Sequence, residues 1–244
     1  MTQWAFWGTI VNTVAVFFGA MLGLGIRAIV GKRKQAVEQG ELAPRRDIAG
    51  TIQKGLGLCV VLIGLLGALE VKYVLVMILS IALGALVGEL CDLDGLLNRF
   101  GAFVERKIGG GQKGTFAQGF VSATLLFCVG AMAIVGSLNS GLLRDHSMLY
   151  TKSLIDMISA FVFATTLGFG VMLSAFLVLI YQGTITLLAS FLAPLLTEMA
   201  INEMTAVGSL LILGLSLNML QITKIKVMNY VPAVFIALFI CLIL

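Results

Sequence analysis

Long apolar runs separated by short polar stretches dominate this chain. Eight such runs stand out, at residues 8–30, 55–71, 73–91, 116–138, 153–172, 174–195, 204–222 and 228–244. A helix needs about 20 mostly apolar residues to cross the hydrocarbon core of a bilayer, so each run predicts one crossing. The pattern therefore predicts an all-α, polytopic transmembrane helical bundle with about eight membrane segments.

The stretch 150–197 allows two interpretations. It holds enough apolar residues for two crossings, yet only "GFGVMLSA" at 168–175, which carries no charge, is available to turn the chain. The stretch could form a tight hairpin of two membrane helices. It could also form one crossing followed by a re-entrant segment that dips into the membrane and returns.

The basic residues favour eight crossings over seven. With eight, thirteen of the 16 lysines and arginines lie on one side of the membrane and three on the other. Seven crossings reduce the bias to eleven against five. Since basic loops stay in the cytoplasm, the larger bias predicts a multi-pass protein of the bacterial cytoplasmic (inner) membrane with both termini on the outer face.

Two polar stretches lie on the predicted cytoplasmic side. Residues 31–54 form a basic connector interrupted by Pro44. Residues 93–107 alternate apolar and charged positions at helical spacing, which predicts an amphipathic helix lying in the membrane interface. The "GGGQKG" that completes the 93–113 segment is interpreted as a flexible hinge. The whole chain, 1–244, is expected to be a single integral-membrane domain.

Composition and charge exclude several classes of protein. The mean hydropathy is +1.07 and 11% of residues are charged, against about 25% in soluble proteins. The net charge of +4 comes from residues that flank apolar spans, so no nucleic-acid partner is expected. The four cysteines lack CxxC spacing and are interpreted as small buried apolar residues. No motif of a catalytic, metal or cofactor site occurs, and no enzyme activity is expected.

Small residues recur at helical spacing within the predicted spans. Gly19 and Gly23 lie on one stripe of the first span, Gly84 and Gly88 on one stripe of the third, and Gly130 on a stripe of the fourth. In lipid, small residues let helix backbones approach closely and so drive their association. All five glycines are predicted to pack helices together.

Polar groups at membrane depth are the candidates for function. Asp156 follows Lys152 by four positions near the start of the fifth span. One interpretation is an ion pair at the membrane interface that ends the helix in water. The other places Asp156 on a polar stripe that leads from the outer mouth into the bundle. An Asp at the centre of a membrane helix costs roughly 2.5 kcal/mol or more, so a function is a reasonable explanation for its presence.

The predicted solute or ion path contains seven residues: Ser137, Asn139, Asp156, Ser159, Thr166, Gln182 and Asn218. Four further polar residues receive structural interpretations. Asn12 is expected to bond a neighbouring helix, and Glu203 and His146 to lie in solvated loops. Glu89 is expected to pair with a nearby arginine or lysine.

A resemblance to a known family rests on several stretches of sequence. They are "CVGAMAIVGSLNSGLLRDHSMLYTKSLIDMISAFVFATTLGFGVMLSA" (128–175), "IYQGTITLLA" (180–189), "IKVMNYVPA" (225–233) and "GTIVNTVAVFFGAMLGLGIR" (8–27). Together they resemble the YqgA/YdfK-like bacterial inner-membrane proteins, the family catalogued as domain of unknown function 554. The resemblance implies a polytopic protein of the cytoplasmic membrane. It brings no assigned substrate and no catalytic residues.

Two functions from different classes follow. The first is a secondary transporter or ion-coupled permease for a small solute or monovalent ion, in which Asp156 is the counter-ion or proton-coupling group. On this hypothesis Asp156→Asn abolishes binding and leaves the fold intact. The alternative is a membrane scaffold or regulatory protein without transport activity, which binds lipid or a protein through 31–54 and 93–107. The expected partners are the lipid bilayer and a small solute or ion. The sequence also allows assembly into a homo-oligomer.

Overall fold

The computed structural model describes residues 4–38, 48–108 and 115–244, and these residues form helices and turns without a strand. The helices are α1 (Trp7–Glu38), α2 (Ile48–Ala68), α3 (Val74–Leu90), α4 (Leu93–Ile108), α5 (Thr115–Cys128), α6 (Ala131–Leu142), α7 (Ser147–Leu167), α8 (Phe169–Leu187), α9 (Ala189–Leu192), α10 (Glu198–Met219), the 3-10 helix η1 (Val227–Tyr230) and α11 (Pro232–Ile243). The predicted all-α class is confirmed.

Within the described residues, five helices are long and apolar enough to cross a membrane. They lie in α1, α2, α7, α8 and α10. Two bent pairs, α3 with α4 and α5 with α6, raise the number to seven if each pair counts as one span. The segment Val227–Ile243 is apolar but shorter. Membrane-spanning helices are therefore confirmed, whereas the count of eight is not.

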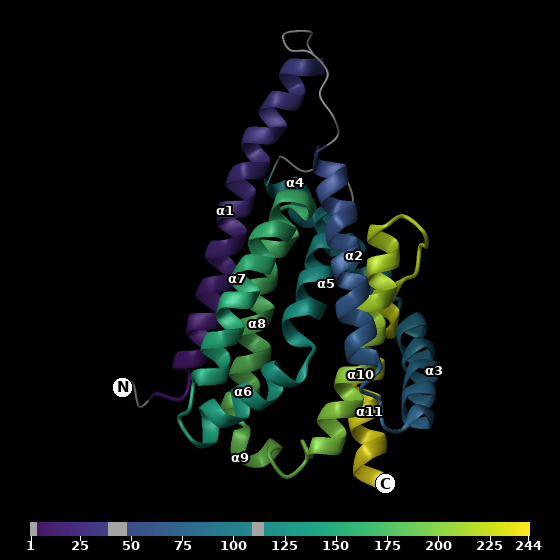
Figure 1. The fold of residues 1–244 in the computed structure, drawn as a ribbon. Coiled ribbons are helices and arrows are strands. Elements are labelled where there is room, and N and C mark those ends of the chain that lie inside the picture. The colour runs from purple at the N-terminus through teal and green to yellow at the C-terminus, as the bar shows by residue number, and fades with distance from the viewer. Residues whose placement is uncertain (1–3, 39–47, 109–114) are drawn as a thin grey trace.

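The helices form an elongated bundle in which segments distant in sequence lie side by side (Figure 1). α1, α7 and α8 pack together on one side, and α2, α3, α10 and α11 on the other. The start of α1 and the end of α11 lie at the same end of the bundle, called here the terminal end. The opposite end, called the connector end, holds the α7–α8 turn and the loop after α10.

α7 and α8 form a tight hairpin, which favours the hairpin interpretation of 150–197 over the re-entrant one. Both helices are long enough to span, and one residue, Gly168, separates them. Gly168 has φ +80° and ψ −149°, a conformation that residues with a Cβ rarely adopt. The Arg27 guanidinium donates a 2.8 Å hydrogen bond to the Thr166 carbonyl and so satisfies an orphan acceptor at the end of α7.

The predicted continuous span 116–138 is interrupted instead. α5 ends at Cys128, α6 begins at Ala131, and their axes differ by 58°. Gly130 lies in the break with φ +129°, and an added Cβ there would meet nothing within 4 Å. Gly130 therefore permits a turn of the backbone and is not a packing residue, which corrects the prediction for this glycine.

The polar stretches are partly helical. α1 continues to Glu38 and α2 begins at Ile48, so both ends of the predicted connector belong to long helices. Pro44 and the predicted hinge at 109–114 lie outside the described residues. α4 forms the predicted amphipathic helix: Leu96 and Phe103 are exposed, while Leu97 is buried in the bundle.

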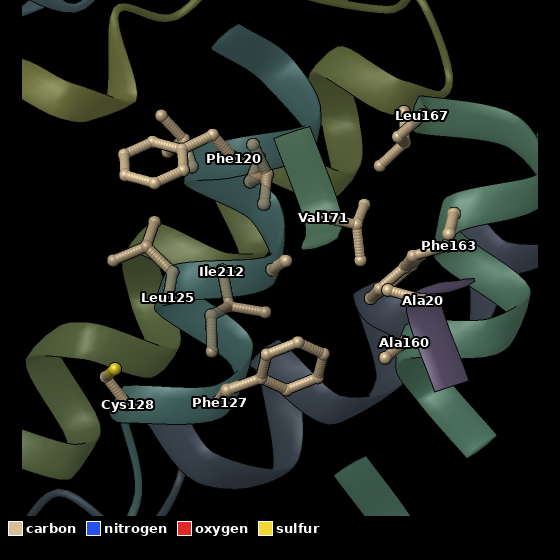
Figure 2. Packing of buried hydrophobic residues seen from close by; sticks show 14 of the residues in the cluster. Ala20, Phe120, Leu125, Phe127, Cys128, Ala160, Phe163, Leu167, Val171 and Ile212 are labelled. Carbon is tan, nitrogen blue, oxygen red and sulfur yellow. The ribbon is translucent and has the colours of Figure 1, made fainter. Parts of the chain in front are cut away.

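Buried apolar side chains from α1, α5, α7, α8 and α10 form the largest cluster of the core (Figure 2). Backbones approach closely around it at the predicted glycines. An added Cβ at Gly19 or Gly23 would collide with the carbonyl oxygens of Met157 and Phe161 on α7. Gly84 lies against Ala233 of α11, and Gly88 against the Asn229 carbonyl of η1.

Candidate functional site

A buried ion pair lies between the helices, in the half of α7 that is nearer the terminal end. The Lys152 ammonium lies 2.9 Å from Asp156 Oδ2 and 3.0 Å from Oδ1. The two side chains are only 8% and 5% exposed. α7 begins at Ser147, six residues before the predicted span, so Asp156 lies about 13 Å along the helix. The pair is thus inside the bundle, and the prediction of an interfacial pair that ends the helix in water is wrong.

Two amides extend this cluster onto neighbouring helices. Asn12 Nδ2 of α1 donates to Asp156 Oδ2 at 3.1 Å and to Gln182 Oε1 of α8 at 3.3 Å. Both amide side chains are fully buried. Among the described residues, Asn12 Oδ1 and Gln182 Nε2 have no hydrogen-bond partner, which leaves one acceptor and one donor unused beside the ion pair. Buried polar atoms are usually satisfied, so these two make the cluster the candidate site.

A second layer of hydroxyl groups lies one helical turn nearer the terminal end. Thr9 Oγ1 of α1 and Thr186 Oγ1 of α8 hydrogen-bond at 3.3 Å. Thr186 Oγ1 also donates to the Ser137 carbonyl of α6 at 3.3 Å. These contacts tie α6 to the two helices that hold the amides.

The close packing of α1 against α7 determines the position of Asn12. Gly8 lies against Leu149, and Gly19 and Gly23 lie against the α7 backbone, so α1 runs beside α7 over several turns. A larger residue at any of these glycines would separate the helices. At this short separation the amide of Asn12 reaches the carboxylate of Asp156.

The break between α5 and α6 lies beside the ion pair. Cys128, the last residue of α5, is buried, and Gly136 of α6 lies against Leu149, three residues before Lys152 on α7. Interrupted helices at membrane depth occur where backbone is buried in protein or lines a cavity. The interruption and the charged pair therefore belong to one region of the bundle.

The structure brings together only some of the predicted path residues. Asp156 and Gln182 meet through Asn12, and the Ser137 carbonyl joins the hydroxyl layer, while the Ser137 hydroxyl bonds Ala133 of its own helix at 2.7 Å. Asn139 and Ser159 are half-buried. No side-chain hydrogen bond of Asn139 or Ser159 occurs within the part of the chain that the structure describes.

Thr166 and Asn218 do not join the cluster. Thr166 Oγ1 donates to the Phe163 carbonyl of its own helix at 3.2 Å. Phe163, which the predicted stripe places between Asp156 and Thr166, belongs to the apolar core shown in Figure 2. Asn218 holds the loop after α10, where its amide contacts Ile225 at 2.7 and 2.9 Å.

Sequence reasoning missed one site residue and misplaced two other buried polar residues. The expectation that Asn12 bonds a neighbouring helix is confirmed, but its membership of the site was not predicted. The solvated position predicted for His146 is wrong, since its ring is buried and its Nδ1 lies 2.7 Å from Ser140 Oγ. Glu203 is also buried, and its Oε1 accepts hydrogen bonds from the backbone N–H groups of Lys72 and Tyr73 at 2.9 Å each.

Two charged groups outside the spans have defined partners. Lys226 donates to Glu89 at 2.8 Å, which confirms the pairing expected for Glu89 and raises the pKa of Lys226. Hydrogen bonds from the backbone and hydroxyl of Ser147 lower the pKa of Asp145, at the start of α7.

The cluster suits a small charged or polar ligand. No group of three or more His, Cys, Asp or Glu side chains that could hold a metal ion occurs among the described residues. One carboxylate with neutral amide oxygens matches a proton or a monovalent cation better than a divalent metal, which needs more hard oxygen ligands. In the structure the Lys152 ammonium occupies the cation position at Asp156.

Comparison with known proteins identifies relatives without an assigned activity. The family described as "Protein of unknown function (DUF554)" matches residues 7–242. The chain is 30% identical to "Uncharacterized membrane protein YdfK" of Bacillus subtilis (strain 168) over 233 residues, 94% of this chain and 93% of the relative. It is 31% identical to "Uncharacterized protein YqgA" of Escherichia coli (strain K12) over 235 residues, 95% of this chain and 94% of the relative. No solved structure matches.

Proposed function

The chain belongs to the DUF554 family of integral membrane proteins, and we propose that it is a secondary transporter or ion-coupled permease rather than an enzyme. The observation that carries the proposal is the buried Lys152–Asp156 pair beside the interrupted helix α5–α6. Discontinuous helices next to intramembrane charges are the usual arrangement of transporter binding sites.

Stability alone does not account for the ion pair. Removing two charges from water costs several kcal/mol per ion, and their attraction in the protein interior does little more than offset this. An apolar pair of similar volume would be about as stable. Since the bundle gains little stability from the pair, a role in binding is the better explanation for its presence.

The pair defines an exchange mechanism. With no solute bound, the Lys152 ammonium neutralises Asp156 and acts as a tethered internal cation. An incoming proton or monovalent cation replaces the ammonium at the carboxylate, with Asn12 Oδ1 as a further ligand. Lys152 lies one turn nearer the terminal end, and its flexible chain carries the displaced ammonium towards water there.

The distribution of basic residues gives the proposed orientation in the membrane. We place the protein in the cytoplasmic membrane with the connector end in the cytoplasm, because most of the basic residues that the structure describes belong to that end. The ion pair then lies nearer the outer face, and solute enters from that side.

Ligand-induced stabilisation of the purified protein tests the proposal. The melting temperature in detergent is measured across pH values, monovalent cations and small polar solutes. A ligand at a hundredfold excess over its dissociation constant stabilises the folded state by about 2.7 kcal/mol. We expect such a shift in the wild type and in Asp145→Asn, a matched loss of one carboxylate outside the site.

The decisive variant replaces both members of the pair. Asp156→Asn alone strands the buried Lys152 charge and destabilises the fold, which changes the earlier expectation that this substitution leaves the fold intact. The double variant Lys152→Met, Asp156→Leu removes both charges and should fold without responding to the ligand. A double variant with the ligand response of the wild type would refute the assignment of this site.

The surface of α4 favours the alternative function. Leu96 and Phe103 are 60% and 56% exposed, as expected for a helix that rests on lipid or on another protein. A membrane scaffold or regulatory protein would lose its activity through polar substitutions on this face and keep it in the Lys152→Met, Asp156→Leu variant. A transporter would show the reverse.

A further inference from the structure

Two adjoining recesses lie at the connector end of the bundle, away from the ion pair. The larger has a volume of about 570 Å³ and lies between α4, α5, the end of α10 and the loop that follows. The smaller has a volume of about 310 Å³ and lies between α3, α10 and η1. Ile225 and Val227 line both recesses, so the two recesses are neighbours that share these side chains as a common wall.

The larger recess is polar and carries available hydrogen-bond donors. Its polar wall contains Asp94, Asn98, Gln118, Asn218, Thr223, Lys224 and Lys226. Asp94 accepts a hydrogen bond from Asn98 at 3.0 Å, and Lys226 pairs with Glu89 at 2.8 Å. The side chains of Lys224 and Gln118 have no hydrogen-bond or ion-pair partner within the part of the chain that the structure describes. They offer an ammonium group and an amide to an anionic ligand.

The smaller recess is apolar. Its lining includes Ile81 of α3, Leu210, Leu213 and Leu217 of α10, and Tyr230 of η1, around Gly214. An added Cβ at Gly214 would meet Ile225 at 3.7 Å and Val227 at 3.9 Å, which are ordinary contacts. The absence of a side chain at Gly214 therefore keeps this groove open and is not required by close packing.

We propose that the two recesses together bind one anionic phospholipid. Its phosphate lies in the polar recess against Lys224 and Gln118, and one acyl chain lies in the apolar groove over Gly214. A ligand that is charged at one end and apolar at the other matches this pair of recesses. Basic residues at the cytoplasmic ends of membrane helices attract anionic lipid in this way. The proposal is independent of the proposed transport activity.

Native mass spectrometry of the delipidated, purified protein tests this site. Bound lipid is counted in titrations with phosphatidylglycerol and with phosphatidylcholine that carry the same acyl chains. The wild type is expected to bind phosphatidylglycerol more tightly. Lys224→Gln should weaken phosphatidylglycerol binding by about fivefold and phosphatidylcholine binding by less, because the choline cation already offsets the charge of its phosphate. Lys54→Gln, which removes an exposed lysine of α2 outside both recesses, should change neither.

The groove is tested separately. Gly214→Leu places a side chain where the acyl chain lies and should weaken binding of both lipids, whereas Gly214→Ala should bind as the wild type does. Leu217→Trp narrows the groove from another position. It replaces Gly214→Leu in this test if that variant does not fold. Equal effects of Lys224→Gln and Lys54→Gln would overturn the proposal. Unchanged binding in the groove variants, or inorganic phosphate that displaces the lipid at equal concentration, would overturn it as well.

Discussion

The energetic weight of the Lys152–Asp156 pair can be predicted from its burial. Both side chains are less than a tenth exposed, so loss of either partner strands a charge that water cannot solvate. Lys152→Met or Asp156→Leu alone should therefore cost about 3–5 kcal/mol. In a domain of this size, that cost lowers the melting temperature by about 6–20 °C.

The double variant should behave differently. Lys152→Met with Asp156→Leu leaves no unpaired charge at this site, and Asn12 Nδ2 keeps Gln182 Oε1 as an acceptor. Its free energy of unfolding should lie near that of the wild type, so the two single effects are strongly non-additive. Thermal unfolding of all four proteins in one detergent measures this coupling. Additive single effects, or a single variant as stable as the wild type, would refute the conclusion that this pair is buried and mutually dependent.

Two further predictions concern packing and a buried carboxylate. Gly23→Ala should destabilise the protein because its Cβ meets the α7 backbone, whereas Gly25→Ala, which meets nothing within 4 Å, should be neutral or slightly stabilising in the same thermal assay. Glu203→Ala should cost about 1–3 kcal/mol, because two backbone N–H groups at the start of α3 lose their acceptor. Glu203→Gln, which keeps an acceptor, should cost less, and equal losses in the two Glu203 variants would argue against this role.

The apolar pattern predicted most of the helices because membrane crossing imposes its own length and composition. The single-residue turn at Gly168 agrees with the predicted lack of polar residues between two spans. The break at Gly130 could not be predicted, because the apolar run continues through it without a polar residue. Only the backbone conformation of Gly130 shows where the helix stops.

The candidate site was predictable only in part, because its members come from distant helices. Asp156 and Gln182 stand out in sequence as polar residues in apolar runs. Asn12 lies 144 positions from Asp156, and no local pattern links the two. Glu203 and His146 lie beside polar stretches that are typical of loops, and only the folded bundle buries them.

The separation of Asn12 and Asp156 along the chain also affects biosynthesis. A ribosome adds about 5–20 residues per second, so α1 would spend about 7–30 s in the membrane before α7 exists. Lys152 and Asp156 are four residues apart on one helix and can neutralise each other as soon as α7 forms. Gln182 follows within the same hairpin, and Asn12 then joins a charge pair that is already complete. The first helix to be synthesised would thus be among the last to reach its final contacts.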